Sequence, residues 1–442
     1  MACEQMTLQD VCELIVDCPH TSAKDEGEGH PLIRTPNVGR GRLVLANVYR
    51  VSQDVYEKRV SRAVPRRGDL ILAREAPAGN VAIIPSGIEV CLGQRTMLLR
   101  PDSSFAVPEY LNYYLNAPEQ RDRMLRLANG ATVSHINVAD IRNMPVQLPS
   151  RVEQSKVAEL LGIFDDKIKL NNQLNDYLVE LLDALFAKAL EETSDWSEAT
   201  LLDIANYKNG LAMQKFRPEG NDPGLPVLKI KELGQGTCSA DSERCRSDID
   251  EAVHIYDGDL VFSWSGTLLL DFWAGGDAGL NQHLFKVTSE EYPTWFYYAW
   301  TKYHMRKFVA LAKDRATTMG HIKRSALAEA KVLIPPSKAF GKLNSQMQPI
   351  VDQMINLKVE ARKLGEFRDS LLPKLMSGEI DVSKIDIMQP ANNHLVQREG
   401  VMIASEASPL MMFFWISLSL YEQAPISVAS HAVSYTYPNK CS

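Results

Sequence analysis

Cysteine is scarce in this sequence, and the few cysteines follow no regular spacing. An odd number of seven excludes a disulfide framework and fits a reducing cytoplasm. The positions are Cys3, Cys12, Cys18, Cys91, Cys238, Cys245 and Cys441. Cys12 and Cys18 are further apart than the cysteines of a structural zinc site, so we predict no metal ion even with His20 nearby.

Long hydrophobic runs are also missing. The longest apolar stretch, Pro409–Tyr421, is interrupted by Ser417 and Ser419 and is shorter than the ~20 residues that a spanning helix needs. Residues Met1–Met6 contain neither the basic segment nor the apolar segment of a secretory signal. We therefore expect no membrane association and a cytoplasmic location.

An overall excess of positive charge is absent. The chain has 48 Lys and Arg against 55 Asp and Glu, which excludes a protein that coats nucleic acid with its whole surface. Positive charge gathers instead in two runs, Arg34–Arg74 with ten basic and three acidic residues, and Lys302–Arg324 with seven basic residues against Asp314. Either run alone would fit a solvated face. One in each half of the chain favours two nucleic-acid-binding surfaces.

Catalytic motifs are missing as well. The chain has no Asn-Pro-Pro-aromatic loop of the kind that DNA amine methyltransferases use, and no glycine-rich phosphate loop. Gly234–Gly236 lacks the third glycine of a dinucleotide-binding fingerprint. Asp314 with Glu329–Lys331 could hold a nuclease metal, but Asn143–Pro145 occupies the corresponding place in the first half. We therefore interpret that set as a charged surface turn and predict no catalytic residue.

What the sequence does contain is an internal repeat. Segments of the first half return in the same order in the second half, at an offset that shrinks from 193 to 186 residues. The pairs are Thr7–Val11 with Thr200–Ile204, Gly68–Ile71 with Gly258–Val261, Leu92–Arg95 with Leu280–His283, His135–Ile136 with His321–Ile322, and Val146–Pro149 with Val332–Pro335. This order indicates a duplication, and 442 residues exceed what one core usually organises.

After each repeat, apolar residues recur every three or four positions, which is typical of a coiled coil. We predict two long helices, at residues 151–192 and 337–380, that pair with each other in antiparallel fashion, with Pro373 ending or kinking the second near Leu372. Asn171 and Asn175 either fix the register of pairing or lie at a wet edge of it. The expected pairing residues are Leu161, Phe164, Ile168, Asn171, Asn175, Leu178, Met347, Ile350, Met354, Leu357, Leu364 and Leu371.

The remaining segments predict two α/β lobes, a first lobe at residues 1–150 and a second lobe at residues 193–336. Short β-rich runs bounded by turn residues indicate strands, and helices are expected near residues 108–129 and 293–313. The strand runs are Leu70–Leu72, Val81–Ile84, Thr96–Leu99, Val227–Ile230 and Leu260–Phe262. Their short spacing favours mixed or antiparallel sheets of an α+β kind.

Two divergent lobes, each closed by a more similar heptad helix, resemble the specificity subunit of type I restriction-modification systems over residues 1–388. Local motifs carry the same resemblance. They are Gly68–Arg74, Leu92–Arg95 and Gly130–Ile136 in the first lobe, and Gly258–Thr267, Leu280–Phe285 and Ala316–Ile322 in the second.

The resemblance implies a non-catalytic protein that binds double-stranded DNA. Each lobe would be a target-recognition domain that reads one half of a bipartite site, and the helices would set the spacer between the halves. Two methyltransferase subunits would dock on the chain, and translocase-nuclease subunits would join them. S-adenosylmethionine, ATP and magnesium would belong to those partners, with no cofactor in this chain.

Polar side chains near the repeated motifs are the candidates for reading bases, because Arg pairs well with guanine and Gln with adenine. They are Arg74, Gln94, Arg95, Ser134 and His135 in the first lobe, and Ser265, Thr267, Gln282, His283, Thr318 and His321 in the second. For each of them a turn or packing role is the alternative. The Gly-Asp-Leu motifs are expected to be structural turns.

Residues 381–442 depart from the resemblance, because the heptads are lost after Ile387. We expect a disordered or aberrant extension, with a short interface segment as the alternative. Two other functions stay open, a protein-binding scaffold with a coiled-coil spacer and a fused restriction enzyme with unrecognised catalytic residues. Steep salt dependence of binding would favour DNA contact over a scaffold.

Overall fold

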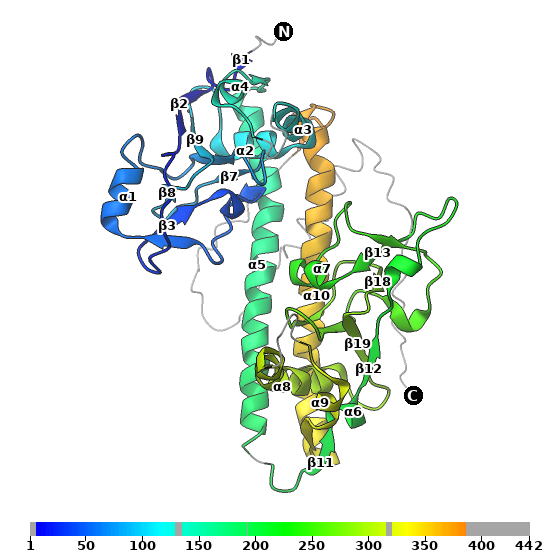
Figure 1. The fold of residues 1–442 in the computed structure, drawn as a ribbon. Coiled ribbons are helices and arrows are strands. Elements are labelled where there is room, and N and C mark those ends of the chain that lie inside the picture. Colours follow the sequence, from blue (N-terminus) through cyan, green and yellow to red (C-terminus); the bar gives the residue numbers. More distant parts are fainter. Residues whose placement is uncertain (1–5, 129–134, 192, 315–320, 386–442) are drawn as a thin grey trace, which may run out of the picture. The chain divides into compact units, whose positions relative to one another are not determined.

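The computed structural model describes residues 6–128, 135–191, 193–314 and 321–385 (Figure 1). The chain divides into two compact units, Met1–Ile163 with Arg368–Ser442 and Phe164–Phe367. Both boundaries fall within long helices, so each unit combines one lobe with parts of both helices.

The first lobe is built on a five-stranded sheet in the order β2-β9-β6-β7-β4. A second sheet has the order β5-β3-β8, and β1 pairs with β10. Among the described residues of this lobe, the strand pairs are antiparallel except β3–β8 and β4–β7. The strands are β1 (Met6–Thr7), β2 (Cys12–Asp17), β3 (His30–Ile33), β4 (Gly41–Arg42), β5 (Tyr49–Val51), β6 (Leu70–Ala73), β7 (Val81–Ile83), β8 (Cys91–Leu92), β9 (Thr96–Pro101) and β10 (Pro145–Val146).

The second lobe repeats most of this topology, although its described residues have no equivalent of β4 and add a strand, β15, beside β18. Its sheets have the orders β12-β19-β16-β17 and β14-β13-β18-β15, and β11 pairs with β20. The parallel pair β13–β18 corresponds to β3–β8. The strands are β11 (Ser197–Thr200), β12 (Asn206–Asn209), β13 (Leu225–Leu228), β14 (Arg244–Cys245), β15 (His254–Ile255), β16 (Leu260–Ser263), β17 (Leu270–Phe272), β18 (Ala278–Leu280), β19 (Leu284–Thr288) and β20 (Lys331–Ile334). The internal repeat and the mixed sheets are confirmed.

Short helices accompany both lobes. The first lobe has α1 (Gln53–Arg59), α2 (Pro108–Asn116), α3 (Pro118–Arg126) and α4 (Val138–Arg142). The second has α6 (Leu201–Ile204), α7 (Ile230–Gln235), α8 (Thr294–Asp314) and α9 (Arg324–Ala328).

Two local predictions were wrong in detail. The helix expected near residues 108–129 is two helices, because Ala117 is extended before Pro118, whose ring disfavours a helical residue in front of it. The strand expected at Val227–Ile230 ends at Leu228, and Ile230 begins α7.

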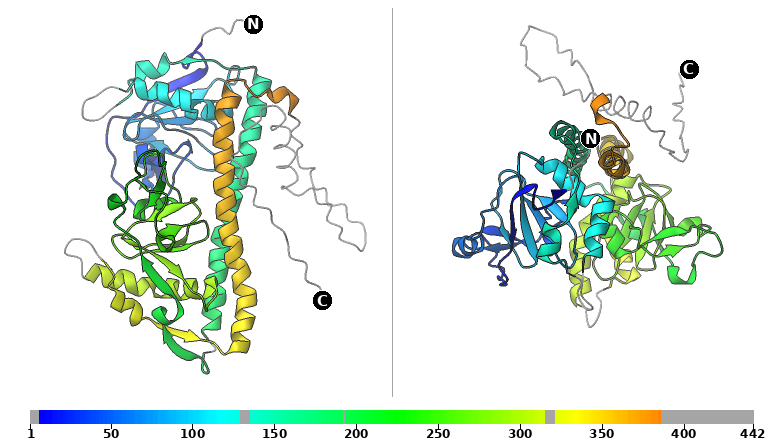
Figure 2. Two further views of the ribbon diagram at one scale, coloured as in Figure 1. Left: turned by 90° about the vertical axis from the view of Figure 1, so that its right-hand side faces the viewer. Right: turned by 90° about the horizontal axis from the view of Figure 1, so that it is seen from above.

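Two long helices, α5 (Arg151–Ala189) and α10 (Ser337–Met376), pack against each other in antiparallel fashion (Figures 1 and 2). In the second unit, Phe164 contacts Phe367 with 5.4 Å between ring centroids. Further along α5, Asn171 donates to Glu360 at 2.8 Å, and Leu182 shares a core cluster with Met347. The partner's number falls as the α5 number rises, which is the antiparallel arrangement.

The predicted end of the second helix near Leu372 was wrong, since α10 continues to Met376. Proline removes a single backbone donor, and here it does so in the last turns of the helix. The amide of Ser377 still donates to the Pro373 carbonyl at 3.0 Å. Leu371 and Leu375 are buried on either side, so packing keeps the last turn helical.

In the second unit, lobe and helices share one hydrophobic core. Phe186 of α5 and Met347, Val351 and Met354 of α10 belong to the same cluster as Trp295 and other aromatic residues of the second lobe. Burying large aromatic side chains against a helix is among the strongest packing contributions available. The orientation of this lobe on the two helices is therefore fixed by side-chain packing within the unit.

Candidate nucleic-acid interface

In each lobe, three segments far apart in the sequence meet at the loop after the central strand, β6 or β16. In the first lobe, the Arg74 amide donates to the Arg95 carbonyl at 2.8 Å, and the Ile136 amide donates to the Arg74 carbonyl at 3.1 Å. In the second lobe, Trp264 makes the same two contacts, with His283 at 3.3 Å and Ile322 at 2.9 Å. The repeat therefore reproduces a site and not only a fold.

The second lobe brings most of its predicted base readers together at this point. Ser265 forms an isolated β-bridge with His321, and its hydroxyl lies 3.1 Å from Nδ1 of His283. Gln282 lies on the other side of that imidazole, with Nε2 to Nε2 at 3.3 Å. Thr267 is exposed on the adjoining turn. These five residues form the second-lobe cluster.

The first lobe has an equivalent cluster with different chemistry. Glu75 bridges His135 as Ser265 bridges His321, and its carboxylate pairs with Nε of Arg95 at 2.9 Å. Gln94 donates to the His20 carbonyl at 3.3 Å. The first lobe therefore brings together three of its candidate base readers, Gln94, Arg95 and His135. Glu75 contacts both Arg95 and His135. We call these four residues the first-lobe cluster.

The candidates differ in how free they are to contact a ligand. Arg74 is 14% exposed and is held by Asp17 at 2.9 Å and by the Ile136 carbonyl at 2.9 Å, and Ser265 is buried. These two side chains therefore have a structural role within their lobes. Solvent reaches the other described candidates: Gln94, Arg95, Thr267 and His321 are exposed, and His135, Gln282 and His283 are half-buried. Ser134 and Thr318 lie outside the described residues.

Sequence reasoning missed Trp264, which takes the place of Arg74 in the second lobe. Its ring lies 5.9 Å from His283 and 6.5 Å from His321, and its Nε1 donates to Asn209 at 3.0 Å. An aromatic face beside two imidazoles is a surface on which a base or sugar can pack. The repeat offset pointed to this residue, because Trp264 aligns with Arg74 once the motifs are superimposed.

The Gly-Asp-Leu motifs hold turns. Asp69 accepts from the Arg66 amide at 2.8 Å, and Asp259 accepts from the Tyr256 amide at 2.8 Å. Each carboxylate also pairs with a cation of the lobe, Asp69 with Arg100 at 2.7 Å. Asp259 pairs in the same way with Lys286, at 2.9 Å.

The two basic runs contain both structural and exposed cations. Arg59 is buried, and its guanidinium donates to two backbone carbonyls. Lys302 pairs with Asp183 of α5 at 2.8 Å. Arg34 and Arg74 are half-buried. Exposed cations of the runs include Arg40, Arg62, Arg66 and Arg67 in the first lobe and Arg306, Lys307, Lys323 and Arg324 in the second.

All twelve residues expected to pair the helices are buried or half-buried. The buried ones are Leu161, Phe164, Asn171, Met347, Met354, Leu357 and Leu371, and the half-buried ones are Ile168, Asn175, Leu178, Ile350 and Leu364. Sequence reasoning missed a second apolar row on α5, made of Leu170, Leu174, Tyr177 and Leu181. We call this row the α5 stripe; its members are 40–68% exposed. Their spacing of four, three and four residues places them on one helix face.

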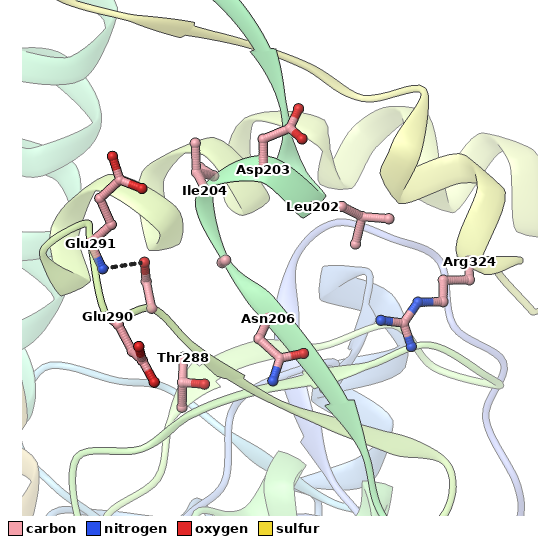
Figure 3. A pocket seen from close by; sticks show the side chains of 10 residues that line it. Leu202, Asp203, Ile204, Asn206, Thr288, Glu290, Glu291 and Arg324 are labelled. Atoms are coloured by element: carbon pink, nitrogen blue, oxygen red, sulfur yellow. Dashed lines mark hydrogen bonds between the residues drawn. The ribbon is translucent and has the colours of Figure 1, made fainter.

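A hollow of about 360 Å³ opens on the second lobe beside α6 and α9. Figure 3 shows that Asp203, Glu290 and Glu291 around it point in different directions, with Arg324 at one side. Hydrogen bonds from the Thr200 hydroxyl and amide lower the pKa of Asp203. A hollow with three carboxylates and one guanidinium repels phosphate, so we assign no DNA contact to it.

Two further findings concern the described residues. No group of three or more His, Cys, Asp or Glu side chains among them could hold a metal ion. None of their helices combines the length and apolarity needed to cross a membrane.

Comparison with known families matches the type I restriction modification DNA specificity domain twice, over residues 2–179 and 193–365. The chain is similar to the type I restriction enzyme MjaIX specificity subunit of Methanocaldococcus jannaschii, with 24% identity over 374 residues that cover 76% of this chain and 84% of that protein. It is also similar to the HindI specificity subunit of Haemophilus influenzae, with 18% identity and coverage of 71% and 87% respectively.

Among solved structures, the fold is similar to the crystal structure of the type I restriction-modification system S subunit from M. genitalium. The TM-score is 0.51 at 17% sequence identity, with coverage of 84% of this chain and 95% of that one. At this identity the likeness shows the fold alone.

Proposed function

Because the chain belongs to the type I restriction-modification DNA specificity family, we propose that it is the non-catalytic subunit that selects the DNA sequence on which such a system acts. Each lobe reads one half of a bipartite target on double-stranded DNA. The paired helices set the number of unread base pairs between the halves.

One observation supports this proposal best. The two lobes position their clusters by the same backbone contacts but fill them with different side chains, with Glu75 and Arg95 where the second lobe has Ser265 and His283. A duplicated scaffold with unlike polar groups is what recognition of two different half-sites requires. Base readout depends on which donors and acceptors the scaffold presents, whereas affinity comes largely from phosphate contacts.

The partner subunits belong to the same proposal. Two methyltransferase subunits dock on the chain, translocase-nuclease subunits join them, and these partners hold S-adenosylmethionine, ATP and magnesium. The α5 stripe supports docking, because an exposed apolar row at heptad spacing fits the face of another amphipathic helix. Two exposed acidic residues, Asp166 and Glu180, lie on α5 next to the stripe. The docking helix should therefore have basic residues beside its apolar face.

Replacing Tyr177 by Asp tests the docking surface. Tyr177 is 68% exposed, so the fold should tolerate the change while the yield of co-purifying methyltransferase subunit falls by about tenfold. The matched control is Val152→Asp, since Val152 is 69% exposed at the start of the same helix and lies outside the stripe. Equal yields for both variants would exclude the stripe as the docking surface.

Genome-wide mapping of methylated bases tests the proposed function as a whole. A host that expresses the cognate methyltransferase subunit is compared with and without this chain. One split motif, present only with the chain, is the expected result. Methylation that does not depend on the chain would refute the proposal, and a repeat with a chain ending at Ile387 would reveal any effect of the C-terminal residues.

A further inference from the structure

A hairpin in the first lobe has no counterpart in the part of the second lobe that the structure describes. It turns at Arg40, closes with an isolated bridge between Val38 and Leu43, and supplies β4, which extends the sheet beyond β7. In the second lobe the corresponding sheet ends at β17 within the described residues. The turn is tight: a Cβ on Gly39 would lie 2.6 Å from the Arg42 carbonyl oxygen.

Two amide side chains fix this hairpin in place. Asn112 of α2 donates to the Gly41 carbonyl at 3.0 Å, and Asn80 donates to the Val38 carbonyl at 3.0 Å. The other end of the Asn80 amide accepts from the guanidinium of Arg121, at 2.6 Å. Asn80 thus positions Arg121, on α3, beside the hairpin that carries Arg40.

Arg40 and Arg121, which we call the guanidinium pair, form no ion pair with any residue that the structure describes, unlike Arg74, Arg95 and Arg100. Arg40 is exposed and has no hydrogen bond or ion pair with any residue that the structure describes. Burial lowers the pKa of Arg121 and the charge of Arg40 lowers it further, whereas Asp122 acts in the opposite direction. Two like charges held near each other favour an anion that can accept from both.

The guanidinium pair is anchored at Asn80, where the loop that contains Glu75 of the first-lobe cluster returns to the sheet. This loop begins at Arg74 and Glu75, and its closing contact is the Ala73 amide donating to the Asn80 carbonyl at 2.8 Å. The two ends of the loop therefore meet, with Glu75 and His135 on one strand side and Asn80 on the other. A ligand bound at this loop would meet both the polar base-contacting groups and the two guanidiniums. Duplex DNA presents bases and phosphates in this manner.

We propose that Arg40 and Arg121 grip one phosphate of the DNA backbone, a contact that the first lobe makes and the second lacks. The inference rests on the proposed function and names a contact within it. In the second lobe, Leu269 takes the register position of Asn80, so no amide is available there to position a second guanidinium. The first lobe therefore contributes more affinity that is independent of sequence.

The test measures the salt dependence of full-length chain binding to a random-sequence DNA duplex. Removing one phosphate contact should reduce the slope of log affinity against log salt by about one and weaken binding roughly tenfold at low salt. Arg40→Gln should do this, whereas Arg151→Gln, which removes an exposed arginine at the start of α5, should not. The effect of Arg40→Gln should be smaller when Arg121→Gln is already present, because the two share one ligand.

Each other outcome has a definite meaning. Unchanged affinity and slope in Arg40→Gln, with the parent chain binding DNA, would overturn this inference alone. No DNA binding by the parent chain at low salt would overturn the proposed function as well. Inorganic phosphate could stabilise the parent chain but not Arg40→Gln, while the two proteins bind DNA equally well. That result would mean that the guanidinium pair binds a free anion and not the DNA backbone. Thermal unfolding of every variant shows whether the first lobe remains folded.

Discussion

Arg74 and Arg95 lie two strands apart in sequence and next to each other in the first lobe, yet they face different surroundings. Arg74 is bound by Asp17 and a backbone carbonyl, while the Arg95 side chain is 56% exposed and pairs with Glu75. An exposed ion pair contributes little to stability and can exchange its partner for a ligand. A largely buried pair leaves an uncompensated charge when one member is removed.

The two arginines should therefore respond to truncation in opposite ways. Arg95→Ala should leave the free energy of unfolding within about 0.5 kcal/mol of the parent chain and weaken target binding by about 1–3 kcal/mol. Arg74→Ala should destabilise the first lobe by about 2–4 kcal/mol, because Asp17 loses its partner. Denaturant unfolding and DNA titration of both variants check this. Equal stability losses would contradict the division between them.

Cys12 provides a prediction about pH. Burial, with a smaller effect of Asp102, raises the pKa of its thiol to about 12 from an ordinary value of 9.0. The folded chain therefore keeps this proton after the unfolded chain has lost it, so this thiol's contribution to stability should be lost as pH rises from about 9 to about 12. At pH 8, alkylation of Cys12 should be roughly a thousandfold slower in the folded chain than in urea. Mass spectrometry of timed samples measures the rate, and equal rates would refute the pKa shift.

At the scale of elements, the heptad seam shows which predictions a pattern can support. Periodicity fixed which faces of α5 and α10 are covered, because apolar spacing reports burial whatever the partner is. It could not show that the α5 stripe is exposed, because apolar spacing does not distinguish a face covered within this chain from one left uncovered. The sequence pattern also overestimated the effect of Pro373 on the helix end. The cost of one missing amide donor depends on the packing of neighbours such as Leu375.

The sequence left two roles open for the asparagines of the helix seam, fixing the register of pairing or lying at a wet edge, and the structure separates Asn171 from Asn175. Asn171 donates to Glu360, which also pairs with Lys167 at 3.5 Å, whereas Oδ1 of Asn175 is buried without a partner. Asn171→Ala should cost about 1–2 kcal/mol of unfolding free energy through the lost charged hydrogen bond. Asn175→Ala should be neutral or slightly stabilising, because it removes an unsatisfied acceptor. Thermal unfolding compares the two, and a larger loss for Asn175→Ala would show that the pairing differs from this register.

For the molecule as a whole, the duplication was the feature that sequence revealed most completely. Ordered motifs predicted two lobes, two helices and equivalent loops, because a repeat constrains topology even where side chains diverge. The repeat could not predict the side-chain contacts inside each site. Whether Arg74 or Arg95 faces solvent depends on Asp17 and Glu75, which no motif connects to them. Trp264 was overlooked because polar side chains alone were considered as base readers.

Duplication also leads to a prediction for the whole molecule. Each lobe has its own sheets and its own cluster, and in the second unit the lobe packs with the helices into one core. If lobes read half-sites independently, replacing residues 1–150 by the first lobe of another family member should change one half of the methylated motif and keep the other half and the spacer. Exchanging residues 193–336 instead should change the opposite half, and methylation mapping reads both. Changes in both halves after a single exchange would mean that the lobes recognise DNA jointly, and a changed spacer would mean that lobe packing, besides the helices, sets the separation.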